Sequence, residues 1–123
     1  MKLTGKGKED FEKWYIIHYE DQYEDCGNTP EEQRGYVELK GFPDGVLWCN
    51  GFYDLPKSMQ YGVYVDFFDS VGIDVRVVKG LITQKFNYRI SDITQVLALD
   101  FGLETRHEAR TKAIEKANEI YNG

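Results

Sequence analysis

The chain has few cysteines and histidines, the residues that stabilise many small proteins through disulfides or bound metals. Only two cysteines, Cys26 and Cys49, and two histidines, His18 and His107, occur in its 123 residues. Two thiols do not make a disulfide framework, and they are typical of a reducing compartment. The four residues also lack the regular spacing of a zinc site, which needs four ligands. We therefore expect neither a disulfide scaffold nor a bound metal.

Long apolar runs are missing as well. No stretch approaches the ~20 apolar residues of a membrane span. The opening residues, 1–14, are basic at the start but have no apolar core of a signal peptide behind them. These absences predict a cytoplasmic protein without a membrane partner.

Recognisable catalytic motifs are absent too. The sequence contains no phosphate-binding loop, dinucleotide fingerprint, zinc-protease helix or nucleophile elbow. Neither histidine stands in a nucleophile–base pattern. Asp66 and Asp69 are spaced to pair their carboxylates on a helix, but exposed pairs of this kind need burial before they do acid–base work. We expect no enzymatic activity and no cofactor.

What is present suits one folded domain. Phe, Tyr and Trp make up 15% of the residues and supply a large core. A chain of this length buries roughly 65–70% of its unfolded surface, so it needs no covalent staples.

The net charge of −6 is concentrated in one stretch. Residues 20–32 contain no lysine or arginine but carry six acids: Glu20, Asp21, Glu24, Asp25, Glu31 and Glu32. This overall charge does not predict attraction of the whole molecule to nucleic acid or anionic lipid. The acidic stretch is a contact surface for a basic partner, a surface that mimics nucleic acid, or a solvated loop.

The first 53 residues predict a helix, a loop and a hairpin. The helix begins between residues 4 and 8, with Glu9 and Asp10 in its first turn. Its spacing predicts one buried stripe, made of Phe11, Trp14, Tyr15 and His18. The acidic residues then form an exposed loop, a capping box at Thr29 starts a short helix, and residues 36–53 form a hairpin around a Pro-Asp-Gly turn.

Residues 54–71 give the best-defined helix. Asp54 can cap it, Pro56 is tolerated in its first turn, and Gly72 ends it in the left-handed conformation. Its apolar residues repeat every four positions, at Met59, Val63, Phe67 and Val71, and Tyr64 and Phe68 widen this stripe. Gly62 inside the helix costs about 1 kcal/mol relative to Ala, which indicates a close approach by another element.

Three strands follow this helix. Residues 74–77 alternate, and residues 85–90 alternate cleanly, with Phe86, Tyr88 and Ile90 inward. Residues 95–101 fit either a helix capped by Ser91 or a strand, and the short alternating run favours the strand. That strand would bury three side chains, Leu97, Leu99 and Phe101.

A second capping box, Thr105-x-x-Glu108, opens the last helix, whose inner stripe is Ala109, Ala113, Ala117 and Ile120. The whole pattern predicts one α+β domain over residues 1–123, with an antiparallel sheet of three or more strands packed against helices. The element order is α-(ββ)-α-β-β-β-α. Residues 1–53 hold the first helix, the acidic loop and the hairpin, and residues 54–123 hold an α-β-β-β-α core.

The start of the last helix is the strongest candidate for a binding site. Arg106 and Arg110 are one turn apart, with His107 beside them and Lys112 further along. Helix-start amides and such side chains together can hold a phosphate. An ordinary packing helix explains the same residues, since Glu108 and Lys112 form an i, i+4 pair.

The α-β-β-β-α order and the string T-R-H-E-A-R-x-x-A-I resemble double-stranded RNA-binding domains. In that family a basic-basic-x-Ala-basic cluster at the start of the last helix spans phosphates of the major groove. The resemblance implies this role for Arg106, His107 and Arg110, around Ala109. The chain departs from the family at the turn after residue 78, which lacks the family's Gly-Pro-x-His loop.

Three longer strings, "MKLTGKGKEDFEKWY", "LPKSMQYGVYVDFFDSVGI" and "TRHEARTKAIEKANEIYN", resemble a family of small proteins from gut Bacteroides-type bacteria and their prophages. This resemblance implies a cytoplasmic protein carried on a mobile element. It implies no activity.

From these observations we expect a non-catalytic binding or accessory protein, phage-related, that acts through protein–protein contact at the acidic residues of 20–32. The alternative is binding of double-stranded RNA or DNA through Arg106, His107, Arg110 and Lys112. An enzymatic function would need a pocket in which His18, Cys49 or an aspartate meets another titratable group.

Overall fold

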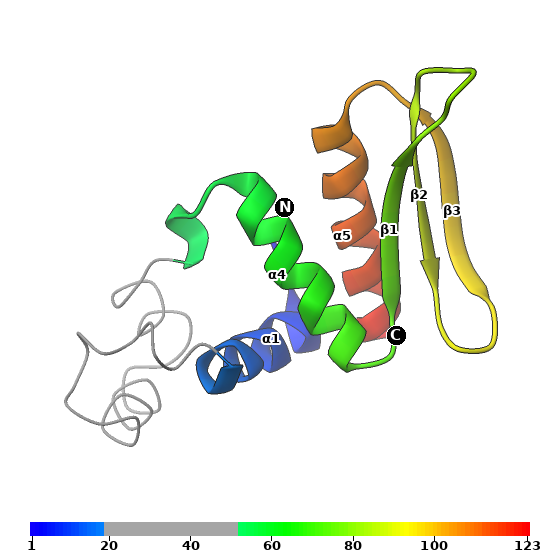
Figure 1. The fold of residues 1–123 in the computed structure, drawn as a ribbon. Coiled ribbons are helices and arrows are strands. Elements are labelled where there is room, and N and C mark those ends of the chain that lie inside the picture. Colours follow the sequence, from blue (N-terminus) through cyan, green and yellow to red (C-terminus); the bar gives the residue numbers. More distant parts are fainter. Residues whose placement is uncertain (19–51) are drawn as a thin grey trace.

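The computed structural model describes residues 1–18 and 52–123, and these form an α+β arrangement (Figure 1). Along the chain the elements are α1 (Gly5–His18), η2 (Phe52–Asp54), α4 (Lys57–Ser70), β1 (Asp74–Lys79), β2 (Phe86–Ser91), β3 (Val96–Leu103) and α5 (Arg106–Asn122). The predicted fold class is confirmed for these residues. The acidic loop, the short helix at Thr29 and the hairpin as far as residue 51 lie outside them.

The helices of the described residues gather on one face of the sheet. The sheet has the order β1-β2-β3, and both strand pairs are antiparallel. The last helix, α5, packs against all three strands, α4 contacts β1 and α5, and α1 packs on α4 and α5 (Figure 1). The other face of the sheet receives none of these helices.

The first helix, α1, starts inside the predicted range and carries an aromatic cluster. Because it begins at Gly5, the predicted position of Glu9 and Asp10 in the first turn is wrong, and that turn holds no acid. Phe11 is buried at the centre of the cluster. Its ring lies 4.8 to 5.9 Å, between centroids, from four other rings, those of Tyr64, Phe52, Phe67 and Tyr15.

The short turn η2 replaces the predicted end of the hairpin and is fastened to α4. The Gln60 side-chain amide donates to the backbone carbonyls of Tyr53 (3.1 Å) and Leu55 (2.9 Å). These bonds give Gln60 a structural role in the core, where it is 1% exposed.

The next helix, α4, starts later than predicted, and its buried face is rotated relative to the predicted stripe. Its N-cap is Pro56, without a side-chain cap, rather than Asp54. Met59 is 57% exposed and Val71 is 41% exposed, so the predicted stripe is wrong at its two ends, while Phe67 is buried as predicted. A repeat of four drifts around the helix by about 40° per step, because 3.6 residues make a turn. The buried residues are Gln60, Tyr64, Phe67 and Phe68, so the predicted places of Phe67 and of the two aromatic residues beside it are confirmed.

Two glycines of this region have different outcomes. Gly72 takes φ +85° just after the helix, which confirms the predicted left-handed end. Gly62 is exposed, and no atom lies within 4 Å of the place where a Cβ would stand. The predicted close approach at Gly62 is therefore wrong.

The strand prediction for residues 95–101 is confirmed, but the predicted faces of β3 are wrong. Leu99 is 51% exposed and Phe101 is 65% exposed, while Leu103 is buried. The pairing of β2 with β3 shifts register twice, and each irregularity breaks the alternation of side chains. Leu99 consequently lies opposite Arg89, which points to the uncovered face.

The predicted N-cap of α5 is confirmed, but the Glu108 carboxylate accepts the Glu104 N–H at 3.4 Å rather than the Thr105 N–H of a full capping box. Thr105 is the N-cap, and its hydroxyl accepts the Glu108 N–H at 3.0 Å. The alanine stripe, Ala109, Ala113 and Ala117, is fully buried. Side chains this small let the helix lie close to the sheet.

A set of hydrogen bonds, which we name the α1–α5 clasp, joins the first turns of α1 to the last turns of α5. The Gly7 N–H donates to the Asn122 side chain (2.7 Å), and the Asn122 amide donates to the Thr4 carbonyl (2.9 Å). With its amide turned to satisfy both ends, Asn118 accepts the Thr4 hydroxyl at 2.9 Å and donates to the Thr4 carbonyl at 3.2 Å. The Tyr121 hydroxyl donates to Asp10, and this bond raises the pKa of Tyr121 to about 12.

The clasp predicts opposite effects for two Gly→Ala substitutions. Gly7 is buried, and an added Cβ would overlap the Asn118 side-chain amide. Gly7→Ala should therefore lower the free energy of unfolding by about 1–3 kcal/mol. Gly62→Ala meets open space on an exposed helix face and should raise it by about 0.5–1 kcal/mol. Urea denaturation of both variants measures the two values, and a neutral Gly7→Ala would contradict the tight contact.

Candidate binding surfaces

The basic start of α5 is held against aromatic rings. The Arg106 guanidinium lies 5.1 Å from the centroid of the Phe86 ring, and the Arg110 guanidinium lies 4.9 Å from that of Tyr61. Cations at such distances are attracted by the face of the ring. Two of the predicted residues are therefore positioned by side chains from β2 and α4.

Lys79, at the end of β1, joins this group. Its ammonium lies 5.8 Å from the centroid of the same Phe86 ring that Arg106 contacts. The structure thus brings together three cations, Lys79, Arg106 and Arg110, which we name the basic cluster. The sequence pattern did not point to Lys79, because it belongs to a strand 27 positions before Arg106 in the numbering.

The other two predicted residues are less closely joined to the basic cluster. Lys112 pairs with Glu108 at 3.5 Å, as the i, i+4 spacing predicted. Two positions along a helix correspond to a rotation of about 200°, so Lys112 points to the opposite flank from Arg110. His107 is exposed in the first turn of α5.

The charges of the basic cluster affect the pKa of Tyr61. Burial raises the pKa of the Tyr61 phenol, and the charges of Arg110 and Arg106 act in the opposite direction. A cation beside a phenol favours the phenolate, because it stabilises the negative form. The two effects oppose each other at one side chain.

A second surface is the face of the sheet that no other described element covers, which we name the open face: Arg76, Val78, Asn87, Arg89, Leu99 and Phe101. Val78 is 55% exposed, and Leu99 and Phe101 are exposed to a similar extent. Arg76 is paired directly with Arg89, and Arg89 in turn with Leu99, so these three side chains cross the sheet in one row. Monomeric proteins rarely leave apolar side chains gathered on a surface in this way without a binding role.

The loop between β1 and β2 extends the open face. Leu81 is 92% exposed and Ile82 is 97% exposed. The loop is closed by two backbone bonds, from Gly80 N–H to the Lys85 carbonyl (2.7 Å) and from Gln84 N–H to the Gly80 carbonyl (3.1 Å). A loop closed by backbone hydrogen bonds therefore exposes these two apolar residues to solvent.

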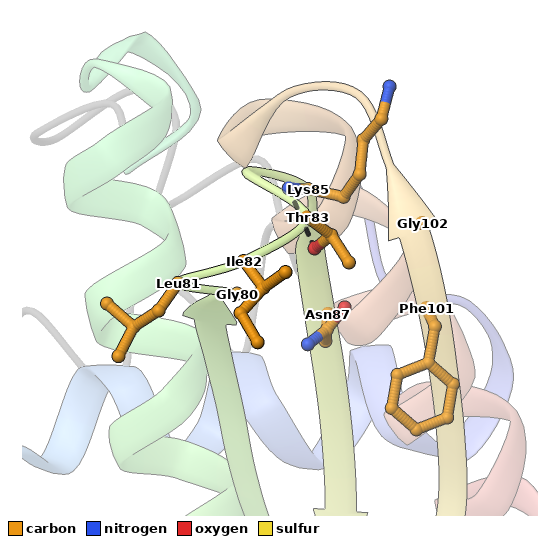
Figure 2. Close-up of a pocket in the computed structure, with 8 residues that line it drawn as sticks. All are labelled: Gly80, Leu81, Ile82, Thr83, Lys85, Asn87, Phe101 and Gly102. Atoms are coloured by element: carbon orange, nitrogen blue, oxygen red, sulfur yellow. Dashed lines mark hydrogen bonds between the residues drawn. The ribbon is translucent and has the colours of Figure 1, made fainter.

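A shallow depression of about 480 Å³ lies between this loop and β3. Figure 2 shows Ile82 and Phe101 on either side of Asn87, with Leu81 projecting away from the sheet. The sequence alone did not reveal this surface. The alternation of residues 74–79 and 86–91 indicated which of their side chains point outward. Because Leu99 and Phe101 were expected to point inward, the sequence did not predict that apolar side chains gather on the outer face.

The acidic contact surface predicted in residues 20–32 lies outside the described residues, as do Cys26 and Cys49. Within residues 1–18 and 52–123, no three acidic, histidine or cysteine side chains gather into a metal site. None of the helices in these ranges is both long and apolar enough to cross a bilayer.

One buried polar group lies between α1, η2 and α4. Glu12 is 1% exposed and accepts a hydrogen bond from the Tyr53 hydroxyl at 3.2 Å. Burial raises the pKa values of both Tyr53 and Tyr64, with the Glu12 charge adding to the effect. These groups are enclosed in the core rather than presented at a surface.

Comparisons with protein-family models, with curated proteins and with solved structures gave no match.

The contact between Arg110 and Tyr61 predicts a pKa change. Arg110→Ala removes the larger of the two cationic effects that oppose burial, so the pKa of Tyr61 should rise further. The shift can be followed in the ring-carbon NMR signals of Tyr61 during a pH titration. Lys112→Ala removes a charge of the same sign on the opposite flank and should leave the Tyr61 titration unchanged. Equal effects of both variants would contradict the stacked geometry.

Proposed function

We propose that this chain is a non-catalytic binding protein that contacts a protein partner through the open face of its sheet and the loop at residues 80–85. The observation that carries the proposal is the number of exposed apolar side chains on this surface: Leu81 and Ile82 in the loop, and Val78, Leu99 and Phe101 on the strands.

Large apolar side chains buried at an interface contribute much of its stability, whereas the same side chains in water contribute nothing. On the inner face of this sheet, α5 covers the apolar side chains of the strands. A partner that covers the outer face would complete a layered arrangement in which the helices of residues 1–18 and 52–123 cover the inner face.

The carriage on a mobile element and the cytoplasmic location stay predictions from the sequence resemblance. The acidic residues of 20–32 stay a second predicted contact region.

Site-specific photo-crosslinking tests the proposal. A benzophenone side chain at position 101 should give a discrete protein adduct in the native host cell, and one at position 93 should not. Ile93 is a matched control, because it is fully exposed but lies at the far end of the sheet. Leu99→Asp should reduce the adduct at position 101 several-fold while changing the free energy of unfolding by less than about 0.5 kcal/mol. Equal adducts from both positions would contradict the proposal.

A second candidate function is binding of double-stranded nucleic acid through the basic cluster. Arg106 and Arg110 make no ion pair with any other described residue, and both are held in place by rings. Unpaired guanidiniums at a helix start are suited to phosphate oxygens. Arg106, His107 and Arg110 are also the positions that match the double-stranded RNA-binding domains.

Fluorescence anisotropy with labelled duplex RNA and duplex DNA tests this candidate. If the basic cluster binds phosphates, affinity should fall steeply with salt, and Arg106→Ala/Arg110→Ala should reduce the log–log salt slope by roughly two, at ~0.9 per lost contact. Lys112→Ala/Lys116→Ala removes the same charge from the other flank and should change the slope far less. Absence of binding at low salt would rule the candidate out.

A further inference from the structure

We propose that the partner of the open face presents large apolar side chains next to carboxylates, so that the contact is an acidic, apolar protein segment. This inference rests on the proposed function and adds the chemistry of the partner. It follows from how charge and apolar surface are divided along the three strands.

The centre of the open face is positively charged. Arg76 and Arg89 are directly opposite each other on β1 and β2, and both are exposed. Like charges in directly opposed positions are unfavourable in an isolated sheet. Asp74 lies near one side of this pair, and its carboxylate accepts the Arg76 Nε–H at 2.8 Å. Arg89 has no such partner among the described residues, so a carboxylate brought by another molecule would relieve the repulsion.

The apolar side chains of the open face lie beside the two arginines, where Leu99 ends their row, and beyond them toward the loop between β1 and β2. Phe101 and Leu99 are on β3, Val78 is on β1 next to Asn87, and the loop residues follow. A partner that covers this surface must place apolar side chains over Phe101 and acidic ones over Arg89. Arginine is suited to the second contact, because its planar group binds a carboxylate through two parallel hydrogen bonds.

A second copy of this chain fits the open face poorly. Face-to-face association of two copies would bring four guanidiniums, those of Arg76 and Arg89 from each, into one small area. Buried like charges disfavour a contact strongly. The charge pattern therefore favours a different, acidic molecule over self-association.

The β3 edge of the sheet is a less suitable docking element than its face. An added strand needs a regular row of free backbone groups, but β3 is irregular at two places. Gly102 takes φ +74°, and the Phe101 N–H is already bonded to the Asp100 carboxylate at 2.8 Å. Such irregularities protect an edge strand from pairing.

A single-stranded nucleic acid also binds arginines and aromatic rings on open sheets. Such binding depends on several aromatic side chains that stack on successive bases. The open face offers one ring, that of Phe101, among aliphatic side chains. The observations therefore favour a protein segment.

A display selection with random 16-residue peptides tests the inference on the full chain. Three forms of the protein serve as bait: the unchanged chain, Arg76→Glu/Arg89→Glu, and Lys13→Glu/Lys57→Glu. The last pair is a matched control, because both lysines are exposed and lie on helices away from the open face. Thermal melts establish that each bait is folded, and a fourth bait, Phe101→Ser, identifies peptides that need the open face.

The inference predicts peptides rich in both Asp or Glu and Leu, Ile or Phe. Their affinity should fall roughly tenfold for Arg76→Glu/Arg89→Glu and stay unchanged for Lys13→Glu/Lys57→Glu. Peptides that need Phe101 but lack an excess of acids would overturn the acidic partner and leave the proposed function standing. Failure to recover any peptide that depends on Phe101 would overturn both. Tight binding of a labelled single-stranded oligonucleotide that is lost in Phe101→Ser would also overturn the inference.

Discussion

The close contact between α5 and the sheet is the constraint on which the other elements depend. Ala109, Ala113 and Ala117 present only methyl groups to the strands, and all three are fully buried. Interiors are close-packed, so a longer side chain at any of these positions would push the helix outward. Because α4 and α1 in turn pack on α5, such a shift would reach the aromatic cluster around Phe11 and the α1–α5 clasp as well.

The same three strands provide both the core and the candidate interface. Residues such as Val75 and Ile90 face α5 and are buried, while their neighbours Arg76 and Arg89 face solvent. A substitution on the outer face can therefore change binding without removing a core contact. The basic cluster differs in this respect, because Phe86 and Tyr61 are half-buried and hold the arginines at the border of the core.

Local signals in the sequence were sufficient for several elements. The N-cap at Thr105, the left-handed Gly72 and the alternation around Tyr88 depend on residues a few positions apart, and all three are confirmed. The rotation of α4 and the faces of β3 depend on contacts between distant elements and on two irregularities in strand pairing, which no local pattern contains. For the same reason the arginines of α5 could be proposed as a site, but their ring partners from α4 and β2 could not.

The α1–α5 clasp also bears on how the protein forms during synthesis. Gly7 and Asn122 are 115 positions apart, so α1 is made long before its hydrogen-bonding partner exists. At about 5–20 residues per second the ribosome needs roughly 6 to 23 s to cover that distance. Throughout this interval the aromatic residues of α1 cannot pack against α5, so their apolar surface stays uncovered by that helix until synthesis is nearly complete.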